Sequence, residues 1–177
     1  MISVRTKLLD LKLIQGGPKV GTPILLLHGW PDDATTWDRV SPHLHAAGFR
    51  TIAPMHRGFG GTRFLSNKTR RTGNVGILCL DAIELMDELQ IDQFFVAGHD
   101  WGSNIAEALA LCWPHRVKRI AMLSTPSRLG GLKTPPFHHA RLHGITGFKL
   151  PSEERLRSQR IPRVSHASCG TPGKVTV

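Results

Sequence analysis

The fold of this chain is decided by residues 93–102, which read QFFVAGHDWG. An apolar run typical of a buried strand leads into Gly98, and helical apolar spacing begins at Ser103. Asp100 therefore stands at the apex of a strand, a tight turn and a helix, in the nucleophile-elbow pattern glycine–x–nucleophile–x–glycine. Glycine is needed at positions 98 and 102 because the apex backbone is strained and side chains there would meet the neighbouring strand and helix.

The apolar pattern on both sides of this elbow predicts a regular alternation of strands and helices. Strands are expected at residues 2–5, 9–13, 24–27, 50–54, 94–97 and 117–123, and helices at residues 37–47, 75–89 and 103–113. Residues 16–18 are expected to form the turn after the second strand, and Pro42 is expected to break the first helix into two pieces. This order predicts an α/β fold with an open, mostly parallel sheet flanked by helices.

The chain changes character after about residue 114, although its overall composition is that of an ordinary globular protein. Residues 1–114 contain 11 Lys and Arg against 11 Asp and Glu, whereas residues 115–177 contain 12 against only Glu153 and Glu154. All four Trp and five of the seven Phe also lie before residue 114. We therefore expect residues 1–123 to form a packed core and residues 124–177 to be an irregular basic tail, a cap remnant or an out-of-frame segment. Within this part, residues 152–177 are expected to be largely disordered.

The sequence also limits the compartment and the binding chemistry. No apolar stretch approaches the roughly 18 residues of a membrane span, and the first residues lack the apolar segment of a signal peptide. Cys79, Cys112 and Cys169 are odd in number and far apart, so they fit neither a disulfide framework nor a metal site. We expect a cytoplasmic protein that uses no cofactor and no metal.

Two further motifs occur in order before the elbow. Residues 28–31 read HGWP and residues 57–62 read RGFGGT, and each follows an expected strand. Together with the elbow they resemble the α/β-hydrolase superfamily, and within it the epoxide hydrolase and haloalkane dehalogenase branch. The HGxP form is typical of epoxide hydrolases, and the resemblance covers roughly residues 1–142. It implies the N-terminal part of an α/β-hydrolase fold.

This resemblance implies a nucleophilic role for Asp100. A carboxylate is ionised at neutral pH and can attack the saturated carbon of an epoxide or an alkyl halide, which forms an alkyl-enzyme ester. The backbone N–H groups of Trp30 and Trp101 would then form the oxyanion hole, and the Trp101 indole could grip a halide. Two plainer interpretations stay open: Asp100 as the N-cap of the following helix, and the two tryptophans as packing residues at the sheet edge.

Other residues of the three motifs are expected to shape the site. His28 is expected to orient its loop, and His99 is expected to pack under the elbow. Residues 57–62 are expected to form a tight glycine-rich turn. This turn lacks the Lys-Ser/Thr ending of a P-loop, which argues against phosphate binding.

The sequence departs from the family pattern after the elbow. Members of this branch use a histidine oriented by an acid to hydrolyse the ester, and epoxide hydrolases use cap-domain tyrosines to protonate the opening ring. This sequence has no tyrosine, and Glu153 and Glu154 lie in a charged stretch typical of a solvated surface. The histidines past the elbow follow no credible strand; they are His115, His138, His139, His143 and His166. We therefore expect a fold that lacks its cap and last strands, truncated or out of frame after about residue 142, and unable to turn over.

The favoured function is that of an epoxide hydrolase acting on a small molecule, with a haloalkane dehalogenase-like hydrolase as the alternative. A non-catalytic protein is a further candidate, because the basic tail would attract nucleic acid or an acidic membrane. Residues 152–177 contain no aromatic residue, so no specific nucleic-acid partner is expected. Residues 117–123 would form an exposed apolar edge, which favours self-association.

Overall fold

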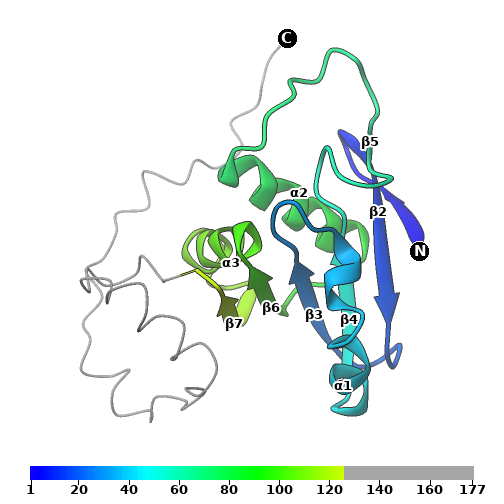
Figure 1. The fold of residues 1–177 in the computed structure, drawn as a ribbon, viewed down its shortest axis with the longest axis vertical. Helices are drawn as coiled ribbons and strands as arrows, with labels where there is room; N and C mark the ends of the chain where they lie inside the picture. Colours follow the sequence, from blue (N-terminus) through cyan, green and yellow to red (C-terminus); the bar gives the residue numbers. More distant parts are fainter. Residues whose placement is uncertain (126–177) are drawn as a thin grey trace, which may run out of the picture.

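The structure, a computed structural model, describes residues 1–125 and contains one mixed β-sheet with helices on both faces (Figure 1). The strands are β1 (Ile2–Arg5), β2 (Leu9–Gly16), β3 (Thr22–Leu27), β4 (Phe49–Pro54), β5 (Arg63–Phe64), β6 (Phe94–His99) and β7 (Val117–Leu123). The helices are the short 3₁₀ helix η1 (Ala34–Trp37), α1 (Ser41–Ala46), α2 (Val75–Glu88) and α3 (Trp101–Cys112). The strand order is β1-β2-β4-β3-β6-β7, with β5 beside β2. Strands β4, β3, β6 and β7 are parallel, and β1, β2 and β5 pair in antiparallel fashion.

The apolar run of β3 is continuous because both faces of the sheet are covered. Leu25 and Leu27 belong to the core cluster that contains the apolar side chains of α2 and α3. Ile24 and Leu26 belong to the cluster on the opposite face, with Trp37 of η1. Successive side chains of a strand point to opposite faces, so burial on both sides requires apolar residues at every position. Figure 1 shows α2 and α3 next to each other and α1 away from them.

The predicted α/β fold with a mostly parallel sheet is confirmed, and three details differ from expectation. Strand β2 continues to Gly16 because its second half pairs with β4, so the turn begins at Gly17, whose φ is 87°. The first helical stretch is split in two as expected, but Pro42 lies in the first turn of α1, where its missing N–H removes no helical bond. Strand β5 was not expected, since two residues are too few to show a periodicity.

The parallel strands bring the three sequence motifs to one edge of the sheet. Strands β3 and β4 are parallel, as are β3 and β6, so their carboxyl ends lie together. These ends lead into residues 28–31, residues 55–62 and Asp100. This is the edge at which open α/β sheets bind their ligands.

Strand β7 is the edge strand of the sheet within residues 1–125, and its residues are exposed or half-buried. Self-association through this edge stays a prediction. Apart from residues 124 and 125, the expected basic tail lies outside the described residues. Among the helices of residues 1–125, none combines the length and the apolar character that crossing a bilayer requires.

Candidate active site

Asp100 lies at the junction of β6 and α3, in a backbone conformation that few residues adopt. Its φ is 53° and its ψ is −115°, outside the regions favoured by residues with a side chain. A Cβ at position 98 would lie 2.2 Å from the Gly102 carbonyl oxygen, and a Cβ at position 102 would lie 2.0 Å from that of Leu27. Both distances are far below van der Waals contact, so the elbow requires glycine at both positions, as the sequence predicted.

Hydrogen bonds from three directions hold this turn. The Asp100 N–H donates to the Leu123 carbonyl oxygen of β7 at 3.0 Å. The Asp100 carbonyl oxygen accepts from the Ser103 N–H at 3.0 Å and from the Thr125 hydroxyl at 3.1 Å. The buried Ser103 hydroxyl lies 2.7 Å from the Gly98 carbonyl oxygen and accepts the Leu123 N–H at 3.1 Å. Both main-chain polar groups of Asp100 are thus partnered, which keeps the strained residue in place.

The Asp100 side chain is directed at the loop after β3. Asp100 occupies the N-cap position of α3, as the N-cap interpretation predicts, but its carboxylate makes no capping hydrogen bond to that helix. Instead, Oδ1 accepts the backbone N–H of Trp30 at 3.1 Å. A Cβ at Gly29 would lie 2.7 Å from the same oxygen, so this approach depends on glycine.

The backbone N–H groups of Trp30 and Trp101, the two expected oxyanion donors, have different surroundings. The Trp30 N–H donates to it directly. Trp101 is the first residue of α3, where N–H groups have no partner within the helix and carry the positive end of its dipole. The Trp30 residue is 63% exposed and Trp101 is 48% exposed within residues 1–125. Packing against the described residues therefore does not explain their positions.

The chain that carries these three motifs at one edge of the sheet matches a known family. The profile described as alpha/beta hydrolase fold matches residues 22–161. The chain belongs to the α/β-hydrolase fold family. It is 40% identical over 106 residues to Epoxide hydrolase 2 of Siraitia grosvenorii, which covers 59% of this chain and 32% of that protein. It is 29% identical over 133 residues to Epoxide hydrolase A of Mycobacterium tuberculosis, which covers 75% of this chain and 40% of that protein.

Solved structures of epoxide hydrolases resemble this α/β-hydrolase in three dimensions. Epoxide Hydrolase A from Mycobacterium thermoresistibile aligns with a TM-score of 0.67 and 31% identity, over 81% of this chain and 44% of that one. An epoxide hydrolase from Vigna radiata aligns with a TM-score of 0.65 and 28% identity, over 81% of this chain and 46% of that one. These relatives place the chain in the epoxide hydrolase branch, and it spans less than half of the length of each of the four.

The histidines of the described α/β-hydrolase core have different surroundings. His28 is fully buried and its Nδ1 lies 2.8 Å from the Gly29 carbonyl oxygen, in agreement with the expected role in orienting the loop. His99 lies at the end of β6 with its side chain 37% exposed and its Nδ1 4.0 Å from Asp32 Oδ2, and its expected packing under the elbow stays a prediction. His115 is exposed and precedes β7, so it lies at the opposite edge of the sheet from Asp100.

The other candidate base and acid residues lie outside the described part of the chain; they are His138, His139, His143, Glu153, Glu154 and His166. Within residues 1–125, no group of three or more His, Cys, Asp or Glu side chains is arranged to hold a metal ion. Asp33 of the loop after β3 caps η1 instead. Hydrogen bonds from the Thr35 hydroxyl and from the Thr35 N–H lower the pKa of its carboxyl.

The glycine-rich turn after β4 forms as expected and is tied to helix α2. The Phe59 N–H donates to the His56 carbonyl oxygen at 2.9 Å, and the Thr62 N–H donates to the Phe59 carbonyl oxygen at 3.1 Å. The buried Arg57 guanidinium donates to both carboxylate oxygens of Asp81 in α2, at 2.6 and 2.5 Å. Burial raises the pKa of Asp81 by more than these bonds from Arg57 lower it.

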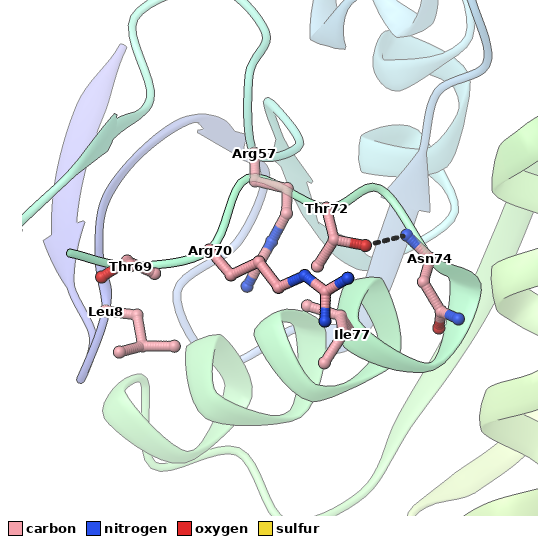
Figure 2. A pocket seen from close by; sticks show the side chains of 7 residues that line it. All are labelled: Leu8, Arg57, Thr69, Arg70, Thr72, Asn74 and Ile77. Atoms are coloured by element: carbon pink, nitrogen blue, oxygen red, sulfur yellow. Dashed lines mark hydrogen bonds between the residues drawn. The ribbon is translucent and has the colours of Figure 1, made fainter. Parts of the chain in front are cut away.

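Arg57 also lines a cavity of about 470 Å³ beside the first turn of α2 (Figure 2). Figure 2 shows Arg57 and Arg70 reaching into the same space between the segment 69–74 and the helix. The lining residues are Leu8, Arg57, Thr69, Arg70, Thr72, Asn74 and Ile77. None of them belongs to the elbow or to the HGWP loop, and Arg57 is the one lining residue from the three motifs.

His56 is a residue of this edge that the sequence motifs did not point to. It precedes the RGFGGT motif, is only 8% exposed, and its ring centroid lies 4.1 Å from that of His28. Burial is the main cause that lowers the pKa of His56 to about 3, so its imidazole is neutral at physiological pH. The one signal in the sequence was its place just after β4, at the edge that also holds the elbow.

Proposed function

We propose that this chain carries the nucleophilic part of an epoxide-hydrolase-type active site, in which Asp100 attacks a ring carbon of an epoxide. The observation that carries this proposal is the 3.1 Å hydrogen bond from the Trp30 N–H to Asp100 Oδ1. It joins two motifs that lie 70 residues apart at one carboxylate. The similarity to proteins named epoxide hydrolases supports the choice of substrate class.

The hydrogen bond assigns different roles to the two carboxylate oxygens. Oδ1 is held by Trp30, so Oδ2 is the oxygen that attacks carbon. As the new Oδ2–C bond forms, the ring C–O bond breaks, and its electron pair passes to the epoxide oxygen, which then takes a proton from solvent water and leaves hydroxide. Oδ1 becomes the carbonyl oxygen of the resulting ester and stays next to the Trp30 N–H.

The same donor serves the hydrolysis of the ester. Water that adds to the carbonyl carbon places negative charge on Oδ1, the atom that the Trp30 N–H faces. The Trp101 N–H, at the free start of α3, is the second donor. Preorganised donors of this kind each contribute roughly a hundredfold or more in rate. Collapse of the intermediate releases the diol and regenerates Asp100.

A base for the hydrolytic water is not assigned within residues 1–125. His28 bonds within its own loop, His99 faces Asp32, and His115 lies at the opposite edge of the sheet. Formation of the ester on Asp100 needs no such base, so it can be tested separately from hydrolysis.

The test is to incubate the full chain with styrene oxide and to map modified peptides by mass spectrometry. We expect one hydroxyalkyl group on Asp100, released by hydroxylamine, because hydroxylamine cleaves esters and leaves thioethers of cysteine intact. Asp100→Asn should abolish this adduct. Asp92→Asn is the matched control, since the Asp92 side chain is 90% exposed and lies outside the three motifs.

Two outcomes would contradict the proposal: a folded chain without the adduct, or an equal adduct on Asp100→Asn. Phenacyl bromide is a useful second probe, because its bromide leaves with the electron pair and no proton has to be supplied. Labelling of Asp100 by phenacyl bromide but not by styrene oxide would favour dehalogenase-type chemistry over epoxide opening.

A further inference from the structure

We propose that His56 is a positioning residue that holds the HGWP loop, residues 28–31, so that the Trp30 N–H is aimed at Asp100. The inference rests on the proposed function only for its catalytic consequence. The arrangement itself is a chain of contacts from His56 through His28 and one peptide plane to the carboxylate.

His56 and His28 are joined by two reciprocal hydrogen bonds. The His56 N–H donates to His28 Nε2 at 3.1 Å, and His56 Nε2 lies 3.1 Å from the His28 carbonyl oxygen. A carbonyl oxygen only accepts, so His56 Nε2 carries a hydrogen. A backbone N–H only donates, so His28 Nε2 carries none. Each ring is therefore held in one neutral tautomer.

The tautomer of His28 orients the next peptide group. With Nε2 unprotonated, His28 Nδ1 carries the hydrogen and donates to the Gly29 carbonyl oxygen at 2.8 Å. The Gly29 carbonyl and the Trp30 N–H belong to the same rigid peptide plane. A bond that holds the carbonyl on one side thus directs the N–H to the other side, where Asp100 Oδ1 accepts it at 3.1 Å.

Burial favours the neutral form of both imidazole rings, those of His28 and His56. His28 is fully buried, and the ring of Phe59 stands edge-on to it at a centroid distance of 5.0 Å. Desolvation lowers the pKa of both histidines, although the Gly29 carbonyl, Asp33 and Asp32 oppose this at His28.

The first test reads the tautomers directly in the unmodified full chain. Imidazole ¹⁵N chemical shifts should identify His28 as the Nδ1–H tautomer and His56 as the Nε2–H tautomer at pH 7. A His28 that carries its hydrogen on Nε2, or that averages between both forms, would overturn the proposal. This measurement does not depend on any reaction of Asp100.

The second test compares His56→Gln with His56→Leu. A glutamine side chain keeps an N–H donor near the place of Nε2, whereas leucine has none. Amide hydrogen exchange of the Trp30 N–H should become roughly tenfold faster in His56→Leu and return toward the original rate in His56→Gln. Val96, in the centre of the sheet, is the internal reference, because global destabilisation would accelerate its exchange as well.

The two proposals fail in different ways. Fixed tautomers without an adduct on Asp100 would overturn the proposed function and support the positioning role. An adduct together with unchanged Trp30 exchange in a folded His56→Leu would overturn the positioning role and support the nucleophile. If His56→Leu does not fold, the tautomer of the His56 ring and Trp30 exchange in His56→Gln decide the positioning role, because the His28 tautomer is set by the backbone N–H of residue 56.

Discussion

Two neighbouring residues of the loop after β4, His56 and Arg57, anchor this loop to two different elements. His56 belongs to a neutral hydrogen-bonded pair, whereas Arg57 belongs to an ion pair. His56 meets His28 of the loop after β3 through two hydrogen bonds between neutral groups. Arg57 meets Asp81 of α2 through two short, charge-assisted hydrogen bonds. All four side chains are buried, so both pairs are shielded from water.

Burial has opposite consequences for the two pairs. It lowers the pKa of His28 and His56, which favours the neutral form of both rings. It raises the pKa of Asp81 although the Arg57 guanidinium opposes this. A neutral pair can therefore fix the direction of a hydrogen bond at little desolvation cost, whereas the ion pair leaves an expensive buried charge when one partner is lost.

The largest expected effect comes from breaking the ion pair on one side only. Asp81→Ala leaves the Arg57 guanidinium buried without its counter-charge, which should lower the free energy of unfolding by about 3–5 kcal/mol. Urea denaturation at pH 7 measures this. The double variant Arg57→Met with Asp81→Leu should recover most of the loss, because it buries no charge. A cost of Asp81→Ala below about 1 kcal/mol would place this pair with ordinary surface ion pairs.

A smaller effect is expected from breaking the neutral pair. His56→Leu leaves the buried His28 carbonyl oxygen without its donor, which should lower the free energy of unfolding by about 1–3 kcal/mol. His56→Gln should lower the free energy of unfolding by less, since its side chain retains an N–H donor for the His28 carbonyl oxygen. Urea denaturation under the same conditions gives the comparison. If His56→Leu cost more than Asp81→Ala, the contrast between the two pairs would be reversed.

The last difference is in how the two pairs respond to pH, and for one titrating group it amounts to at most about 1.4 kcal/mol for a change of one pH unit. The pKa of His56 is about 3 in the folded chain and near 6.5 when unfolded, so between these values the unfolded state binds more protons. The His56 contribution to stability is thus complete above about pH 6.5 and is lost as the pH falls toward 3.

The Asp81 contribution to stability changes with pH in the opposite direction. Its pKa is raised above the ordinary 3.8, so just above that pH the folded state binds the proton more tightly, and stability falls as the pH rises through this window. Urea midpoints measured between pH 4 and 7 should therefore depend less on pH in His56→Gln and more on pH in the Arg57→Met, Asp81→Leu double variant. If the unmodified chain, His56→Gln and the double variant showed the same pH dependence, the lowered pKa of His56 and the raised pKa of Asp81 would both be contradicted.

The nucleophile elbow could be predicted from the sequence because its constraints are local. A strand, a strained apex and the close approach of Gly98 to Gly102 all lie within residues 93–102. The alternation of strands and helices was predictable for the same reason, since apolar periodicity is a property of each segment. Strand β5 and the true extent of β2 were not, because partners elsewhere in the sheet define them.

The surroundings of His99 also depend on tertiary structure. Its neighbour Asp100 is at the apex, and His99 lies at the end of β6, with its side chain partly exposed and its Nδ1 4.0 Å from Asp32 Oδ2 of the loop after β3. His56 and Asp81 gave no motif signal, because their partners lie 28 and 24 residues away in the sequence. Pairing of β3 with β4 brings His28 and His56 together, and the position of α2 brings Asp81 to Arg57.

The sequence by itself determined the α/β architecture and the place of Asp100 at the end of a buried strand, since both follow from short-range periodicity and from glycine sterics. Only the tertiary structure decided that Oδ1 is the oxygen held by the Trp30 N–H, and that two buried histidines hold the peptide carrying that N–H. Hydrogen-bond direction depends on which loops the sheet brings together, and no local pattern of residues specifies that.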